Sequence, residues 1–180
     1  DGERLHYDKL VLATGGRSRC LTTPGAVASN LFYLRTLTDV DAIRAEFWAG
    51  KRLLIIGGGY IGLEVAAVAV QKGLDVTVLE SGARVLARVT APQMSDFYES
   101  VHRAAGVDLR TGVKLHSFEQ ENGRVIAARL EDGTRIATDF VIAGIGLVPN
   151  TELASEAGLE VADGIHVNEF GATSDPDILA

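Results

Sequence analysis

The clearest hydrophobic pattern in the chain is an apolar run, Leu53 to Ile56, that ends on glycines and continues as a helical repeat of small and apolar residues up to Lys72. Gly73 stands where a glycine commonly ends a helix. A second apolar run, Asp75–Leu79, follows directly. Because a change of period marks a change of element, this stretch predicts a strand, a helix over residues 60–72 and a second strand, which form one βαβ unit.

A further helix is predicted on each side of this unit. In the first, Thr38 is the expected N-cap and Gly50 the end, with Ile43 and Phe47 facing the core. In the second, Thr90 is the expected N-cap of a helix over residues 92–105, which begins with a proline and is followed by a glycine. The expected apolar stripe of this second helix consists of Phe97, Val101 and Ala104, and His102 is expected to be a partly exposed helix residue.

From residue 114 the pattern changes to short alternating segments, at residues 114–118, 124–130 and 134–137. They are joined by Asn122-Gly123 and Asp132-Gly133, two dipeptides that are typical of hairpin turns. The pattern therefore predicts an antiparallel β-meander. The predicted fold class is α/β, a Rossmann-like three-layer nucleotide-binding domain with a parallel sheet and this meander.

Two segments, Tyr7–Gly15 and Thr138–Gly146, share an aspartate, an apolar run and terminal glycines. Each is predicted to be a buried strand, and each follows a hairpin signal. This repetition indicates two domains of one plan, of which only the second is complete. The predicted boundaries are residues 1–36 for the end of a first-domain segment, 37–148 for the complete domain and 149–180 for the start of a return to the first.

Composition narrows the function classes. A net charge of −7 over 180 residues disfavours binding to nucleic acid or to an anionic membrane, and no apolar stretch approaches the roughly 18 residues of a membrane span. Cys20, the single cysteine, excludes an internal disulfide and a cysteine zinc cluster, and it favours a reducing, cytoplasmic location. No metal site is predicted.

The glycines after the first strand of the βαβ unit fit the dinucleotide fingerprint Gly-x-Gly-x-x-Gly, as Gly57, Gly59 and Gly62. In that fingerprint the glycines allow a tight turn, a close approach of the pyrophosphate and close helix–strand packing. Glu80 ends the second strand, 18 residues after Gly62, where an acidic residue accepts hydrogen bonds from the adenine ribose. A carboxylate there repels a 2′-phosphate, so NAD(H) is the predicted cofactor. A preference for NADPH would instead indicate a phosphate site at Arg84 or Arg88. The competing interpretation is a plain strand–turn–helix with a surface glutamate.

With these motifs in place, the chain resembles the FAD-dependent pyridine-nucleotide oxidoreductases, and within them the NADH:ferredoxin reductases of the putidaredoxin reductase type. The resemblance is carried by residues 7–15, 57–64, 144–150 and 164–178, and the narrower match by residues 84–92 and 102–108. It implies hydride transfer from NADH to FAD, followed by electron transfer to a two-iron two-sulfur ferredoxin. Hydride transfer requires no side-chain acid or base, so no catalytic residue is predicted.

The resemblance also implies a role for individual residues. Those expected at the NAD site are Gly57, Gly59, Tyr60, Ile61 and Gly62 at the pyrophosphate, Glu80 at the ribose, Glu64, Gly144, Ile145 and Gly146 near the nicotinamide, and Arg88 on the adenosine side. Those expected at the FAD site are Thr14, Gly15 and Arg19. Glu64 is also open to interpretation as a carboxylate favoured by the helix dipole, and Arg88 as a solvated loop residue.

Two motifs of the family are missing from this sequence, namely the FAD fingerprint that would precede residue 1 and the flavin-contacting Ala-Gly-Asp that would follow Ala180. The polypeptide is therefore expected to bind NAD(H) and to retain little or no FAD. Three alternatives stay open. One is an NADH-dependent disulfide or small-molecule reductase or NADH oxidase of the same fold, which an upstream cysteine pair would favour. Another is a non-enzymatic NAD-sensing module, and a methyltransferase-like fold is a remote third.

Overall fold

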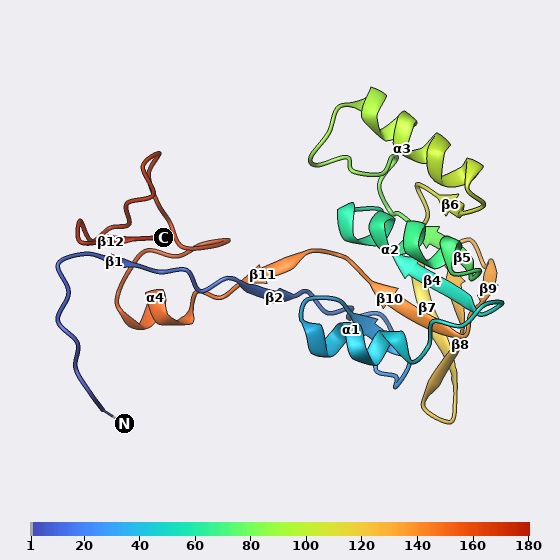
Figure 1. Cartoon of the computed structure of the whole chain (residues 1–180), viewed down its shortest axis with the longest axis horizontal. Helices are drawn as coiled ribbons and strands as arrows, with labels where there is room; N and C mark the ends of the chain where they lie inside the picture. The colour runs from blue at the N-terminus through green and yellow to red at the C-terminus, as the bar shows by residue number, and fades with distance from the viewer. Residues whose placement is uncertain (1) are drawn as a thin grey trace. The chain divides into compact units, whose positions relative to one another are not determined.

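A parallel sheet in the order β3-β10-β4-β5-β6 forms the centre of residues Ser18–Gly146 (Figure 1). The computed structural model describes residues 2–180, which divide into this unit and a smaller one made of the residues up to Arg17 with Leu147–Ala180. The larger unit begins well before residue 37 because β3 pairs with β10. Its sheet strands are β3 (Leu31–Tyr33), β4 (Arg52–Ile56), β5 (Asp75–Leu79), β6 (Asp108–Arg110) and β10 (Phe140–Ala143).

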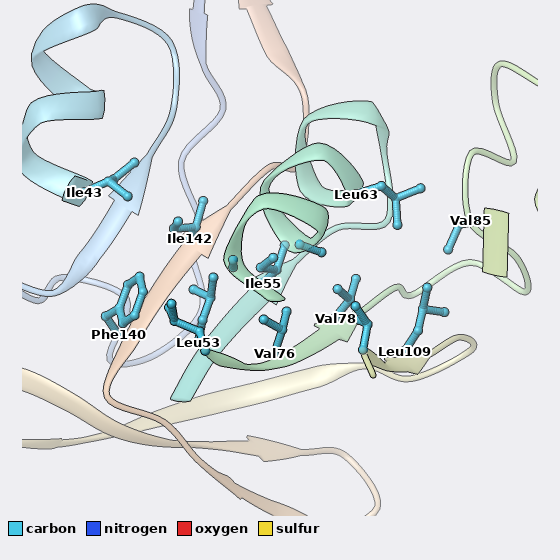
Figure 2. Packing of buried hydrophobic residues seen from close by; sticks show 14 of the residues in the cluster. Ile43, Leu53, Ile55, Leu63, Val76, Val78, Val85, Leu109, Phe140 and Ile142 are labelled. Carbon is cyan, nitrogen blue, oxygen red and sulfur yellow. The ribbon is translucent and has the colours of Figure 1, made fainter. Parts of the chain in front are cut away.

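Both faces of this sheet are covered, which explains why its central strands are apolar at nearly every position. In β4, Leu53 and Ile55 pack towards the helices, whereas Leu54 and Ile56 pack towards the meander. Phe140 and Ile142 alternate with their neighbours in the same way along β10. Figure 2 shows the helix-side layer, with Ile43 and Leu63 from helices above the strand side chains. The predicted three-layer α/β fold is confirmed.

The helices on this face are α1 (Leu37–Arg44), α2 (Tyr60–Gln71) and α3 (Pro92–Ala104). The predicted N-cap of α1, Thr38, is wrong. Thr36 is the cap, and it forms a capping box in which Asp39 N donates to the Thr36 hydroxyl while the Asp39 carboxylate accepts from Thr36 N. This helix ends at Arg44, six residues before Gly50. In the described part of the chain, no helix is both long and apolar enough to cross a membrane.

The predicted orientation of α3 is also wrong. Phe97 and Val101 are exposed, whereas Ser95 and His102 are buried. The buried polar groups find backbone partners: the ring nitrogens of His102 lie 2.8 Å from Tyr98 O and 3.0 Å from Leu63 O. Ala91 is the N-cap, because the Thr90 hydroxyl bonds instead to Leu86 O at 3.3 Å. Thus α3 packs through a polar face that contacts main-chain groups of α2 and of the loop before α3.

The β-meander is confirmed on the opposite face of the sheet. It consists of β7 (Leu115–Glu121), β8 (Arg124–Leu130) and β9 (Arg135–Ala137) in antiparallel order. Asn30, fully buried before β3, fastens it to the sheet. The Asn30 amide donates to Val125 O at 2.9 Å and to Asp139 O at 2.7 Å, and its oxygen accepts from Val125 N at 2.7 Å.

The smaller unit contains short elements around the buried side chains of Ala154, Leu159 and Ile178. Of the buried strand predicted from Tyr7 to Gly15, only β1 (Leu10–Val11) forms, and the predicted burial is wrong for Val11, whose side chain is exposed. Within the described residues, β1 pairs with one strand only, β12 (Ile178–Leu179). The smaller unit also contains β11 (Leu147–Pro149) and α4 (Glu152–Glu156). Strand β2 (Gly16–Ser18), which pairs with β11, crosses the boundary between the units, because Ser18 belongs to the larger one.

We expect Asn30→Ala to lower the free energy of unfolding by about 2–4 kcal/mol, because it leaves the buried Val125 N–H and two carbonyls without their partner. Urea unfolding followed by circular dichroism measures the change. Ser29→Ala is the matched control, since the Ser29 hydroxyl donates to Gly123 O at an exposed position, and it should change stability by less than about 0.5 kcal/mol. Equal unfolding midpoints for both variants would contradict this account of Asn30.

Candidate dinucleotide-binding site

The turn from β4 into α2 is built on backbone approaches that only glycine permits. A Cβ atom on Gly57 would lie 2.4 Å from Gly144 O, and Gly57 has a φ of +106°. A Cβ atom on Gly62 would lie 2.1 Å from Gly57 O. The first turn of α2 therefore lies directly against the carboxyl ends of β4 and β10.

Gly59 differs from these two glycines, because a Cβ atom placed on it would meet nothing within 4 Å. It is the N-cap of α2 and has no side chain to cap the helix. The first N–H groups of a helix have no intrahelical acceptor, and they carry the positive end of the helix dipole. Tyr60 and Ile61, which begin α2, are both exposed. This surface is thus open, polar and suited to a phosphate group.

Glu80 follows the last residue of β5 and faces this helix start. Its carboxylate accepts a hydrogen bond from Gly58 N at 2.7 Å on Oε2 and from Gly82 N at 2.6 Å on Oε1. Each carboxylate oxygen can accept two hydrogen bonds, so each keeps one further lone pair for a ligand hydroxyl. Its main chain is fixed as well, because Glu80 N donates to Arg110 O at 2.9 Å.

The third part of the site is the segment after β10. Gly144 lies beside the first turn of α2: a Cβ atom on it would be 3.6 Å from Gly62 N and 4.0 Å from Ile61 Cγ2. Ile145 is half-buried and Gly146 is exposed. Glu64, one turn into α2, borders together with Ile61 a mainly apolar groove of about 610 Å³ between α1 and α2. The structure therefore brings the fingerprint glycines, Glu80 and the predicted nicotinamide-side residues to one edge of the sheet.

The two arginines of the loop after Glu80 have different surroundings. The Arg84 guanidinium donates to Ser95 Oγ at 2.6 Å and to Ala87 O at 2.9 Å, so it is held within the protein. Arg88 is exposed, and none of the described residues forms a hydrogen bond or ion pair with its guanidinium. The role of Arg88 on the adenosine side stays a prediction.

The residues predicted for an FAD site fall in two different units of the described chain, and their role stays a prediction. Thr14 and Gly15 belong to the smaller unit, whereas Arg19 belongs to the larger one. The Thr14 hydroxyl donates to Asn150 O at 2.6 Å, and Asn150 N donates to Gly15 O at 3.0 Å. These contacts brace the smaller unit internally.

Several groups that shape the site have no clear signal in the sequence. Gly58 and Gly82 donate the main-chain hydrogen bonds that orient Glu80, and Gly58 is an unconstrained position in the fingerprint. A Cβ atom on Gly58 would lie 2.9 Å from Val85 Cγ1, so this position also needs glycine. Ser95, fully buried in α3, contacts the same loop and lies 15 residues beyond Glu80 in the sequence.

These observations fit a dinucleotide of the NAD type. Gly59 leaves an open cradle at a helix start, and the carboxylate of Glu80 retains acceptor capacity for ribose hydroxyls. A bound pyrophosphate would rest on the first turn of α2, with the adenosine towards Glu80 and the nicotinamide towards Ile61 and Gly144. The individual contacts stay predictions.

Comparison with known proteins gives the family. The sequence matches the pyridine nucleotide-disulphide oxidoreductase family over residues 1–180. It is 57% identical to putidaredoxin reductase CamA of Pseudomonas putida over 185 residues, which cover 100% of this chain and 44% of that protein. It is 42% identical to a rubredoxin-NAD(+) reductase of Pseudomonas putida over 180 residues, which cover 100% of this chain and 47% of that protein.

A solved structure supports the same relationship. In the crystal structure of the covalent putidaredoxin reductase–putidaredoxin complex, the matching chain is 56% identical and superposes with a TM-score of 0.90, covering 97% of this chain and 43% of that chain. The family resemblance predicted from the motifs is confirmed. The chain spans less than half the length of the curated relatives it matches.

Gly59→Ala is expected to lower NADH affinity, whereas Gly62→Ala is expected to lower the stability of the fold. At Gly59 the backbone has a φ of −82° and the Cβ position is open, so we expect little change in stability but NADH affinity lowered by about tenfold, because the methyl group occupies the surface that the pyrophosphate approaches. At Gly62 the Cβ would collide with Gly57 O, so we expect a clear fall in melting temperature.

Fluorescence titration with NADH and thermal unfolding of both variants measure the two effects. If Gly59→Ala bound NADH as tightly as the unchanged chain, the pyrophosphate would not lie against this residue.

Proposed function

This chain belongs to the pyridine nucleotide-disulphide oxidoreductase family, and from that premise we propose that it is the NAD(H)-binding portion of an FAD-dependent NADH reductase. We assign the larger unit, Ser18–Gly146, to NAD(H) binding, which extends the predicted residues 37–148 at their start because β3 belongs to its sheet, and we assign the segments on either side to an FAD-binding domain. When bound, the two cofactors supply the hydride and electron transfer. The residues of this chain bind and orient NADH, and none of them acts as an acid or base.

The observation that carries the proposal is the fixed carboxylate of Glu80 beside the open start of α2. Its two oxygens are oriented by Gly58 N and Gly82 N, and a vicinal diol can donate to the lone pairs that remain. A 2′-phosphate at the same place would bring two anions together. Of the two loop arginines, Arg84 is already bonded to Ser95 and Ala87, while Arg88 is exposed. The site therefore favours NADH over NADPH.

The electron acceptor of the intact protein is proposed to be a small iron–sulfur protein, a two-iron two-sulfur ferredoxin. The support is the 57% identity to a putidaredoxin reductase and the high structural similarity to one that was crystallised with putidaredoxin. The similarity to a rubredoxin reductase supports the broader class, electron transfer to a small redox protein. A cytoplasmic location stays a prediction.

We expect the purified chain to bind NADH saturably and NADPH at least tenfold more weakly. Glu80→Ala should weaken NADH binding by about tenfold, because it removes charged acceptors for the ribose hydroxyls, and it should narrow the difference between the two nucleotides. Nicotinamide fluorescence measures both affinities.

Asp75→Asn is the matched control, because it removes one negative charge from the other end of β5 and should leave both affinities unchanged. Thermal unfolding of Glu80→Ala shows whether the loss of the Gly58 and Gly82 hydrogen bonds has disturbed the fold. Tighter binding of NADPH than of NADH by the unchanged chain would contradict the proposed role of Glu80.

The isolated chain should retain little or no FAD. The Thr14 hydroxyl and the Gly15 carbonyl are already bonded to Asn150 within the smaller unit. Absorbance near the flavin band after purification in the presence of FAD measures the content. A stoichiometric yellow complex would show that these segments bind flavin without further protein.

A further inference from the structure

We infer that Ser95 is a specificity-determining residue, which holds the Arg84 guanidinium away from the ribose 2′ position and so strengthens the preference for NADH. This inference rests on the proposed function of the site. Ser95 is a positioning residue, because it acts through Arg84 and does not itself reach the nucleotide.

The Ser95 hydroxyl is fully buried and makes two hydrogen bonds. It donates to Val85 O at 2.6 Å and accepts from Arg84 Nη1 at 2.6 Å. One oxygen thus fixes both the main chain of the loop and the side chain of its first arginine. A second contact, from Arg84 Nη2 to Ala87 O at 2.9 Å, completes the restraint on the guanidinium.

The loop that Ser95 holds is the one that borders the Glu80 carboxylate. Gly82 N donates to Glu80 Oε1, and Arg84 follows two residues later. On the far side of Arg84, Leu86 N donates to Gly58 O at 3.0 Å, while Gly58 N donates to Glu80 Oε2. Arg84 is therefore flanked on both sides by segments that bond to Glu80 or to its partner Gly58.

A guanidinium in such a loop is the group that would accommodate a 2′-phosphate. In this chain it is turned towards α3, where a neutral hydroxyl and a carbonyl accept hydrogen bonds from two of its five N–H groups. Removal of the Ser95 hydroxyl deletes the side-chain acceptor and leaves the single Ala87 contact. The Arg84 guanidinium can then move to a nearby 2′-phosphate, because its hydrogen bond to the charged phosphate is stronger than its hydrogen bond to the neutral carbonyl of Ala87.

The test compares NADH and NADPH dissociation constants for the unchanged chain, Ser95→Ala, Arg84→Ala and the double variant. We expect Ser95→Ala to lower the ratio of the NADPH to the NADH constant by about tenfold, with NADH binding changed less than about twofold. Arg84→Ala alone should keep the original ratio. In the double variant this relative gain in NADPH affinity should disappear, because the Arg84 guanidinium that would bind the 2′-phosphate is absent.

If the role of Ser95 were purely structural, its replacement would weaken the binding of NADH and NADPH equally, and the ratio of their dissociation constants would stay constant. Ser95→Cys provides a second variant if Ser95→Ala does not fold, since the thiol keeps the approximate volume and a weak donor for Val85 O but is a poor acceptor for the guanidinium. The inference about Ser95, but not the proposed function, is overturned if a folded Ser95 variant keeps the original ratio of the NADPH to the NADH dissociation constant. It is also overturned if the double variant, which lacks Arg84, shows the same gain in NADPH affinity. Failure of the unchanged chain to bind NADH overturns the proposed function as well.

Discussion

The site depends on one constraint, the contact of backbone with backbone where β4, β10 and α2 meet. Gly57 N donates to Leu79 O and Gly144 N donates to Ile56 O, both at 2.8 Å, so the ends of three neighbouring strands are tied to one another. A side chain on Gly57 or Gly62 would separate them. Because these residues have no side chains, the start of α2 lies against the strand ends. Its first N–H groups therefore lie beside the carboxylate of Glu80.

Much of the larger unit can be predicted because its signals are local. The β4–α2–β5 unit follows from a change of hydrophobic period between glycines, and the meander follows from Asn122-Gly123 and Asp132-Gly133. The strand β3 has no such signal, because its three residues are set by pairing with β10, more than 100 positions later. The cap of α1 is ambiguous for another reason. Thr36 and Asp39 have the same spacing as Thr38 and Asp41, and only the folded chain shows which pair bonds.

The orientation of α3 marks the limit of reasoning from amphipathicity. Burial of an apolar stripe is the usual outcome, yet α3 buries Ser95 and His102 and exposes Phe97. The surface beneath it explains this result, because it presents two main-chain carbonyls, Val85 O and Leu63 O. A carbonyl removed from water needs a donor, and an apolar stripe would provide none. The sequence does not reveal which backbone groups a helix will cover, so Ser95 could not be recognised as part of the site.

The same argument connects the core with nucleotide selectivity. Glu80 is fixed at its main chain by Arg110 O and at both carboxylate oxygens by Gly58 and Gly82, before any ligand is present. A carboxylate whose position is already set loses little conformational entropy when it accepts a ribose hydroxyl, and it cannot turn away from a phosphate. Of the two arginines in the loop, Arg84 is bonded to a helix hydroxyl instead. Under the proposed function, discrimination between NADH and NADPH therefore depends on how α3 and two loops pack around the end of β5. The Glu80 side chain is one part of this arrangement.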